Sequence, residues 1–368
     1  MNKANNSLLM KEQNRYHVLR LIRAESLSRA ELARKTGLTR AAVSIIVDKL
    51  ISDGLILEGE AVKSSSGRHP KSLYLNAEKY YGIGIDITRD GCTVVLCNLA
   101  SETEKKQFIE FENTREKTLE KIYSVIEEYL SDNVLGIGVS SPGPLDTERG
   151  IILNVPELEI FKDFNIKEAL EEKFQLPVYL EKDTNALALQ EKNCFSRDNF
   201  LYVLADHGLG CAYIKDGALF KGFGGLGCEI GHISLDMNGE KCSCGNRGCA
   251  SLYTSVSSAV KRGGAKSYGE LCALANNGDA PSMDALIYQG KMLSQVLLTA
   301  VNLFEPEGIV LGGELQHGAN ILKGIIEEEL SKKALSRAIH SIKVDASLIK
   351  DRALSPALSV LERFFMKG

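Results

Sequence analysis

Apolar and polar residues over the first 76 positions repeat first with the period of a helix and then with that of a strand. Apolar side chains recur three and four positions apart in three segments. The second segment starts at a capping box formed by Ser28 and Glu31, and the third starts at Thr39. The expected elements are helices over residues 14–23, 28–35 and 39–53 and strands over residues 55–58 and 72–75. This order predicts a winged helix-turn-helix over residues 1–76.

From residue 81 onward, strand patterns rich in branched and aromatic residues alternate with amphipathic helix patterns. In a first half the expected strands are 81–87, 92–99, 106–111, 135–139 and 178–180, with helices over 116–130, 166–174 and 183–194. In a second half the expected strands are 200–204, 211–215, 308–311 and 344–346, with helices over 255–262, 267–276, 281–304, 321–331 and 356–366. This alternation predicts the α/β class, with functional residues in loops at the strand ends. The expected lobes are residues 77–187, joined by 346–368, and residues 188–345.

Charge separates the N-terminal module from the rest of the chain. The net charge is −4, but residues 1–76 hold 13 lysines and arginines against 7 acids, while the remainder holds 31 against 41. A basic module on an acidic body predicts a polyanionic partner for the module alone.

The expected third helix would enter the DNA major groove by its N-terminal end. Its exposed early residues are Thr39, Arg40, Ala41 and Ser44. Arg40 can reach either a guanine edge or a phosphate. Arg68, beside Gly67 in the polar loop between the two wing strands, suits a narrow minor groove. We therefore expect the module to bind double-stranded DNA; the alternative is a winged helix that contacts protein.

One histidine and three cysteines form the most specific chemical pattern in the chain: His232, Cys242, Cys244 and Cys249. Two glycines between the last two cysteines let the chain bend so that the thiolates converge. One imidazole and three thiolates are the closed ligand set of a structural Zn²⁺ site. The alternative is free buried cysteines beside a core histidine.

Composition adds limits on class and compartment. Hydrophobic residues make up 44% and charged residues 25%, as in ordinary globular proteins. The sequence has no apolar run long enough to span a bilayer and no signal-peptide pattern over residues 1–10. Most of the nine cysteines stand singly in apolar segments, which predicts a reducing cytoplasm.

Several motifs together resemble the ROK family of repressors, open reading frames and kinases, over residues 14–368. They are Gly67-Arg68, Ser141-Pro142-Gly143-Pro144, Asp183-Thr184-Asn185-Ala186, Glu229-Ile230-Gly231-His232, the cysteine motif, and Pro306 to Gly313. The resemblance implies a two-lobed body with the actin-like ATPase fold of sugar kinases. It also implies a sugar-responsive repressor, a homodimer or homotetramer, that releases operator DNA when an effector binds.

The resemblance also implies a ligand site. Asp183, Glu229 and His232 match positions that contact sugar in the family. Lys182 stands where the family has asparagine, and Ser251 stands where it has a second glutamate. A cation gained and an anion lost favour an acidic or phosphorylated sugar, with a cyclitol also considered. The alternative is that Lys182 turns outward or pairs with Glu181, which leaves a pocket for a neutral polyol.

Two loops depart from the phosphate-binding pattern of the family's kinases. Residues 86–90 read Asp-Ile-Thr-Arg-Asp instead of Asp-x-Gly-Gly-Thr, and residues 206–210 read Asp-His-Gly-Leu-Gly instead of Gly-Thr-Gly-x-Gly. Side chains at the glycine positions keep phosphates away from the backbone. We therefore expect no enzyme activity, and we expect Asp183, at the catalytic-base position, to accept a ligand hydroxyl. The alternatives are a sugar kinase with an appended DNA-binding module, and a constitutive DNA-binding protein whose body only oligomerises.

Overall fold

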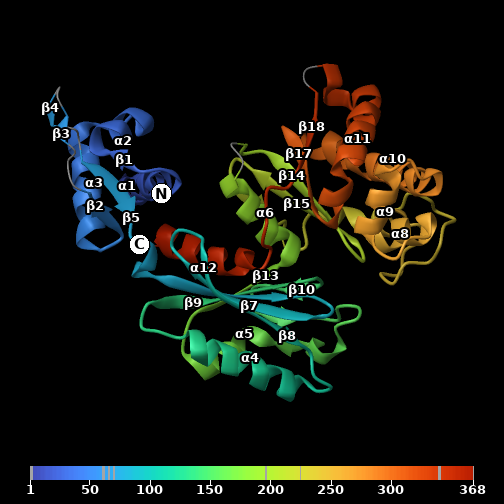
Figure 1. The fold of residues 1–368 in the computed structure, drawn as a ribbon, viewed down its shortest axis with the longest axis horizontal. Coiled ribbons are helices and arrows are strands. Elements are labelled where there is room, and N and C mark those ends of the chain that lie inside the picture. The colour runs from blue at the N-terminus through green and yellow to red at the C-terminus, as the bar shows by residue number, and fades with distance from the viewer. Residues whose placement is uncertain are drawn as a thin grey trace. The chain divides into compact units, whose positions relative to one another are not determined.

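The computed structural model describes residues 3–59, 63–64, 67–68, 71–194, 197–223, 225–338 and 341–367 (Figure 1). The chain divides into two compact units, Met1–Glu181 with Ala353–Gly368, and Lys182–Arg352. This division differs from the predicted lobe boundary after residue 187, and it places Asp183 in the same unit as Glu229. Among the described residues, no helix combines the length and the apolar character that crossing a bilayer requires.

The winged helix at the start of the first unit has the three predicted helices, α1 (Lys3–Ala24), α2 (Arg29–Thr36) and α3 (Arg40–Ser52). The predicted capping box is present, because Ser28 accepts a hydrogen bond from the backbone of Glu31 and the Glu31 carboxylate accepts one from the backbone of Ser28. Thr39 caps α3 by accepting from the backbone N–H of Ala42 at 3.2 Å. Local capping chemistry therefore fixes where the recognition helix begins.

The wing contains more strand than the sequence pattern indicates. Strand β5 (Ser72–Leu75) lies between β1 (Leu27–Ser28) and β2 (Ile56–Glu58), and all pairings are antiparallel. Within the expected polar loop, β3 (Lys63–Ser64) pairs with β4 (Gly67–Arg68). Segments of two residues are too short to show a strand period, so these strands arise from pairing rather than from pattern.

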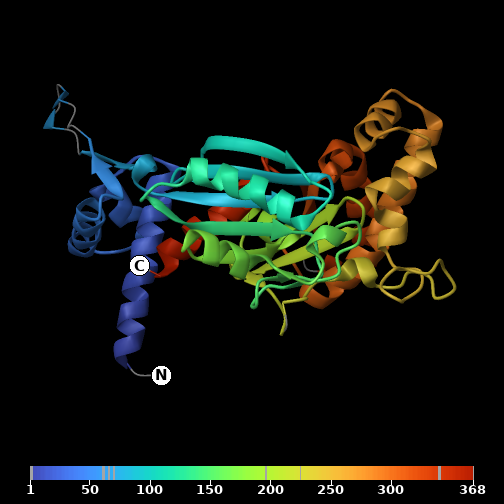
Figure 2. The same ribbon diagram turned by 90° about the horizontal axis from the view of Figure 1, so that it is seen from below.

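The remainder of the first unit is a three-layer α/β structure around a five-stranded sheet, in the order β13-β9-β6-β7-β8. Its strands are β6 (Tyr81–Ile87), β7 (Gly91–Asn98), β8 (Thr103–Glu110), β9 (Val134–Ser141) and β13 (Val178–Lys182). Helices α4 (Arg115–Tyr129) and α5 (Ile166–Phe174) cover one face, and α12 (Leu354–Lys367) covers the other (Figures 1 and 2). A small sheet of β10 (Leu145–Asp146), β11 (Ile151–Ile152) and β12 (Phe164–Asn165) was not predicted.

Two glycines allow α12 to lie close to this sheet. A Cβ at Gly84 would stand 2.7 Å from the backbone nitrogen of Ala357, and one at Gly138 would stand 1.9 Å from the carbonyl oxygen of Pro356. Alternate residues of β6, including Ile83 and Ile85, face the opposite core. The strand therefore presents side chains to α4 and α5 and bare backbone to α12.

The C-terminal part of α12 also packs on the winged helix within the first unit. Glu362 accepts a hydrogen bond from the hydroxyl of Tyr16 at 2.5 Å and pairs with Arg23 at 3.5 Å. Phe365 belongs to the same apolar cluster as Val18 and Ile22 of α1. The DNA-binding module thus shares its core with the last helix of the chain.

The second unit repeats the layered design around the sheet β16-β15-β14-β17-β18. Its strands are β14 (Phe200–Ala205), β15 (Leu209–Lys215), β16 (Ala218–Phe220), β17 (Gly308–Gly313) and β18 (Lys343–Ala346). Helix α6 (Asp183–Cys194) packs on one face of the sheet, through a cluster that includes Leu187 and Tyr202. The other face carries a cluster that includes residues of α8 (Val256–Gly263), α9 (Tyr268–Asn276), α10 (Ala280–Phe304) and α11 (Ala319–Lys333). The short helix α7 (Ser251–Thr254) precedes α8.

Candidate ligand, metal and DNA-binding sites

The predicted ligand residues Lys182 and Glu229 contact each other in the second unit. Lys182 is the last residue of β13, and Glu229 immediately precedes the short 3-10 helix η3 (Ile230–His232). The Lys182 ammonium donates a hydrogen bond to the Glu229 carboxylate, and the two side chains are 12% and 34% exposed. The sequence left open whether Lys182 faces the pocket, turns outward or pairs with Glu181; in the structure it contacts Glu229.

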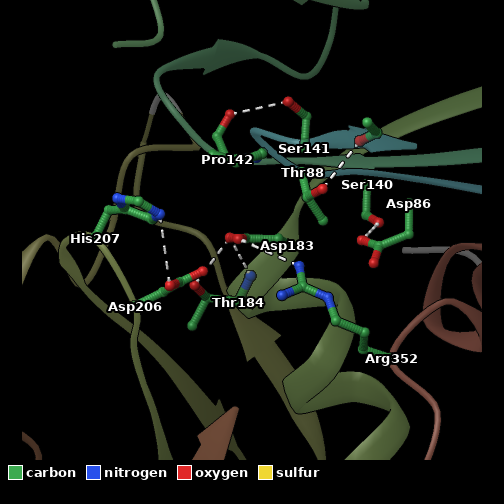
Figure 3. A network of polar contacts seen from close by, with 11 residues as sticks. Asp86, Thr88, Ser140, Ser141, Pro142, Asp183, Thr184, Asp206, His207 and Arg352 are labelled. Carbon is green, nitrogen blue, oxygen red and sulfur yellow. Dashed lines mark hydrogen bonds and ion pairs between the residues drawn. The ribbon is translucent and has the colours of Figure 1, made fainter. Parts of the chain in front are cut away.

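Asp183 is held at the N-terminus of α6 and faces a second cation. Its Oδ1 accepts from the backbone N–H of Thr184 at 2.6 Å and from the Thr184 hydroxyl at 3.1 Å. Its Oδ2 lies 3.8 Å from a guanidinium nitrogen of Arg352 (Figure 3). Sequence analysis missed Arg352, because no local pattern signals a partner that joins the site from so far along the chain.

Ser251, another predicted ligand residue, supports the neighbouring loop. Its hydroxyl accepts a hydrogen bond from the backbone N–H of Leu209 at 3.1 Å. Gly231 lies so close to this hydroxyl that a Cβ there would stand 2.5 Å from it. Ser251 therefore connects the turn at residues 206–210 to the segment that carries Glu229 and His232.

The resulting site presents two cations and two anions. Lys182 balances Glu229, and Arg352 balances Asp183. Guanidinium and ammonium groups only donate hydrogen bonds and carboxylates only accept them, so the four side chains offer both kinds of partner to hydroxyl groups. The arrangement suits a molecule with several hydroxyls, and its balanced charge reduces the anion preference that Lys182 alone implies.

Polar contacts in the first unit close the turn between β6 and β7. The Ser140 hydroxyl donates to the buried Asp86 carboxylate at 2.7 Å, and the Thr88 hydroxyl donates to the carbonyl of Gly91 at 3.0 Å (Figure 3). Arg89 forms an ion pair with Glu157 at 3.1 Å. In the second unit, His207 lies 3.9 Å from Asp206 in the turn between β14 and β15 (Figure 3). The first turn thus carries an ion pair, and the second carries a carboxylate beside an imidazole.

The four predicted metal ligands converge in the second unit. One donor atom from each of His232, Cys242, Cys244 and Cys249 lies within 4.8 Å of the others. Cys242 Sγ is 3.8 Å from His232 Nδ1, and Cys244 Sγ is 3.6 Å from Cys249 Sγ. Donors placed about 2.0–2.3 Å from one tetrahedral ion stand roughly 3.3–3.8 Å apart. Two of the donor distances lie in this range, and the four donors form a group that could hold a metal ion.

Backbone contacts build the turn that brings the cysteines together. The N–H of Cys242 donates to the carbonyl of Asn246 at 2.8 Å, and that of Gly245 donates to the carbonyl of Cys242 at 3.0 Å. Gly248 has a φ of 59°, and a Cβ there would stand 1.9 Å from the carbonyl oxygen of Asp236. Only glycine fits this position, because a side chain meets both the strained φ and the carbonyl.

Thiol acidity at the cluster is uneven. Burial opposes ionisation of Cys242, but hydrogen bonds from the Cys244 backbone and from neighbouring ligand side chains lower its pKa to about 7. Burial and the nearby Cys244 and Cys242 thiols raise the pKa of Cys249 to about 12. Negative charge on the Cys242 sulfur opposes ionisation of Cys249, and a bound cation would remove that opposition.

The exposed face of α3 carries the predicted DNA-binding residues. Thr39, Arg40 and Ala41 are exposed and Ser44 is half-buried. Arg40 makes no ion pair with any residue in the described part of the chain. Ile45, which sequence analysis did not select, is 71% exposed on this face. Arg68 lies opposite Lys63 in the β3–β4 ladder, and its side chain falls outside the described residues.

Known protein families match both the N-terminal module and the body of the chain. The sequence profile of the ROK family matches residues 82–361, and that of the MarR family matches residues 12–63. The xylose repressor of Bacillus subtilis (strain 168) is 30% identical over 372 residues, which cover 97% of this chain and 94% of that protein.

Solved structures agree on the fold. A ROK family transcriptional regulator, described as a homologue of the Escherichia coli MLC protein, superposes with a TM-score of 0.80 at 26% identity and covers 97% of both chains. The ROK hexokinase of Thermus thermophilus superposes with a TM-score of 0.67 at 23% identity, over 78% of this chain and 100% of the hexokinase. The predicted combination of a winged helix and a kinase-like α/β body is confirmed.

Proposed function

The chain belongs to the ROK family, and we propose that it is a sugar-responsive, DNA-binding transcriptional repressor of carbohydrate-utilisation genes. The observation that carries the proposal is the presence, in one chain, of a winged helix with an exposed recognition face and a second-unit site rich in hydroxyl-binding groups. The similarity to a repressor over 97% of the chain supports both parts together.

We propose that α3 and the wing bind DNA. The cationic Arg40 stands at the N-terminus of α3, where the helix dipole also favours a phosphate. Thr39, Ala41 and Ser44 accompany it on the same helix end, and Arg68 is proposed to reach the minor groove from the wing. The MarR family match over residues 12–63 supports double-stranded operator DNA as the partner.

We propose that the effector is bound by Lys182, Asp183, Glu229 and Arg352. His232 and Ser251 hold the surrounding segments in position. Because each anion is already paired with a cation, we propose a polyhydroxylated effector, a neutral sugar or cyclitol in preference to a sugar phosphate. This revises the expectation drawn from Lys182 alone. The similar repressor is named for xylose, which supports a carbohydrate for this chain.

The position of these residues along the chain supplies a route for regulation. Lys182 and Arg352 are the first and last residues of the second unit, so the chain passes between the units directly beside both ion pairs. Helix α12 starts two residues after Arg352 and continues to the winged helix. A ligand that changes either ion pair therefore acts where the chain enters or leaves the unit, and a change in half-site spacing would release operator DNA.

We propose that the protein is not a kinase, although its body has the kinase fold. Arg89, which pairs with Glu157, stands in the turn that matches the first phosphate loop of the family's kinases, and Asp206 adds an anion to the second such turn. Arg352 lies 3.8 Å from Asp183, so the residue at the catalytic-base position is engaged in an ion pair. The hexokinase similarity, at 23% identity, speaks to fold alone.

Zinc is the metal that the cluster fits best. Three thiolates and one imidazole in a compact set are typical of structural Zn²⁺ sites. The ion would brace the segment that carries Glu229 and His232, so metal affinity would contribute to folding of the effector site. A homodimer or homotetramer acting on chromosomal DNA in the cytoplasm completes the proposal, because two winged helices are needed to read a two-fold operator.

The function is tested with the full-length protein and a randomised DNA library. Selection should enrich a two-fold related sequence, and anisotropy titrations with that duplex should show binding that weakens steeply with salt. A panel of pentoses, hexoses, amino sugars and cyclitols should contain at least one compound that lowers operator affinity. Failure to enrich any sequence would refute the repressor function, and enrichment without any sugar response would favour the constitutive alternative.

A further inference from the structure

Ile45 is an apolar side chain in solvent on a helix that buries its other large apolar residues. Helix α3 places Val43, Val47 and Leu50 in the core, each with no exposed surface, whereas Ile45 is 71% exposed. A single exposed isoleucine is ordinary on a protein surface. Ile45 is informative because it lies on α3, the helix that we propose enters the major groove of DNA.

Ile45 lies at the centre of the face that would enter the major groove. Residues three and four apart share one side of a helix, so Ala41, Ser44, Ile45 and Asp48 face the same way, opposite the buried stripe. Ala41 is exposed and Ser44 is half-buried, and both are small. The isoleucine therefore projects beyond its neighbours on this face.

Charges around Ile45 fit nucleic acid better than an apolar protein partner. Arg40, five residues before Ile45 at the N-terminal end of α3, supplies a cation. Asp48, the acid one turn after it, pairs with Arg29 at 2.7 Å, which weakens its repulsion of phosphates. Small or polar neighbours leave no broad apolar patch of the kind that protein interfaces need. A cation followed by one apolar side chain matches a groove that offers acceptor atoms and isolated methyl groups.

We propose that Ile45 contacts the C5 methyl group of a thymine in each operator half-site and thereby specifies an A·T pair at that position. The inference rests on the proposed DNA-binding function and deepens it. The thymine methyl is the apolar feature of the major-groove edge, and apolar side chains distinguish thymine from cytosine by contacting it. Ile45 is thus a base-reading residue in addition to Arg40.

The test removes the methyl group without changing base pairing. The operator duplex obtained by selection is synthesised with deoxyuridine in place of each thymidine in turn, and its affinity for full-length protein is measured. At one position per half-site the wild type should lose affinity about fourfold, the ratio that corresponds to burying one methyl group at about 0.8 kcal/mol. Ile45→Ala, which loses the contact in both half-sites, should bind the thymidine duplex about as weakly as wild type binds a duplex that carries deoxyuridine at this position of both half-sites, and should show no further loss on deoxyuridine.

Controls separate a base contact from a general effect. Leu303→Ala changes a side chain that is also 71% exposed, but in the second unit, and should keep the full deoxyuridine effect. Ile45→Val retains methyl groups and should keep most of it. Selection without enrichment would overturn both the repressor function and this inference. Enrichment with equal deoxyuridine losses for wild type and Ile45→Ala, or with no loss at any position, would overturn the inference alone.

Discussion

Glu229→Gln removes one charge from the proposed effector site and leaves its shape almost unchanged. Lys182 donates to this carboxylate and is only 12% exposed, so the substitution leaves a largely buried ammonium without its anionic partner. Loss of a partner by a buried polar group costs about 1–3 kcal/mol. The free energy of unfolding should fall within that range, and the protein should remain folded, since domains are typically stable by about 5–15 kcal/mol.

The effect on effector binding follows from the same carboxylate. A hydrogen bond from a ligand hydroxyl to a charged acceptor contributes about 1.5–3 kcal/mol, against about 0.5–1.5 kcal/mol for a neutral one. Replacing carboxylate by amide should therefore weaken a neutral sugar by roughly tenfold. The positive charge of Lys182, which the Glu229 carboxylate then no longer balances, should at the same time improve binding of sugar acids.

Thermodynamic linkage limits how much the effector, and therefore the Glu229→Gln substitution, can change operator affinity. An effector that binds one state 100-fold more tightly shifts operator affinity by at most about 2.7 kcal/mol per site. In Glu229→Gln the sugar-induced loss of operator affinity should shrink strongly at the same sugar concentration, while affinity without sugar stays at the wild-type value.

The assay is operator anisotropy with and without the sugar that acts on wild type, together with calorimetry of that sugar. Glu240→Gln, at an exposed glutamate of the same segment, is the matched control and should respond like wild type. A normal sugar response in Glu229→Gln would place the effector elsewhere. An equal loss of operator affinity with and without sugar would show that Glu229 has a structural role only.

Three further predictions concern metal, catalysis and pH. Untreated protein should contain one zinc per chain, and Cys244→Ala should lose it and melt at lower temperature; elemental analysis without stoichiometric zinc in wild type contradicts the site. A coupled assay with Mg²⁺-ATP and common hexoses should detect no phosphorylation, and turnover that disappears in Asp183→Asn would show that the chain is a kinase after all. Burial raises the pKa of Glu191, whose carboxylate accepts from the backbone of Leu348 at 2.8 Å. A raised pKa means that this group stabilises the fold below its unfolded pKa of about 4.3 and loses that contribution as pH rises through the folded value. Urea denaturation should therefore show the stability of wild type relative to Glu191→Gln falling as pH increases from 4, and a difference that is constant with pH would argue against a buried, perturbed carboxylate.

Local chemistry in the sequence determined much of the architecture. Helices α5 and α6 and strand β6 lie where their patterns predicted, and the Ser28 capping box and Thr39 cap fix the start of the two DNA-binding helices. The zinc ligands were evident from residue type and spacing alone, because three of them lie within one short turn. Strands of two residues, such as β1, escaped prediction because periodicity needs a longer segment.

Long-range packing decided the rest. No local pattern indicates that Lys182 meets Glu229 or that Arg352 meets Asp183, because ion pairs between distant segments exist only once the fold brings those segments together. The same holds for Ile45, whose apolar side chain fits a buried stripe by type and is exposed only because α3 turns its other face to the core. Sequence determined which chemical groups are present and where each helix begins; tertiary structure decided which charges neutralise one another and which side chains remain available to a ligand or to DNA.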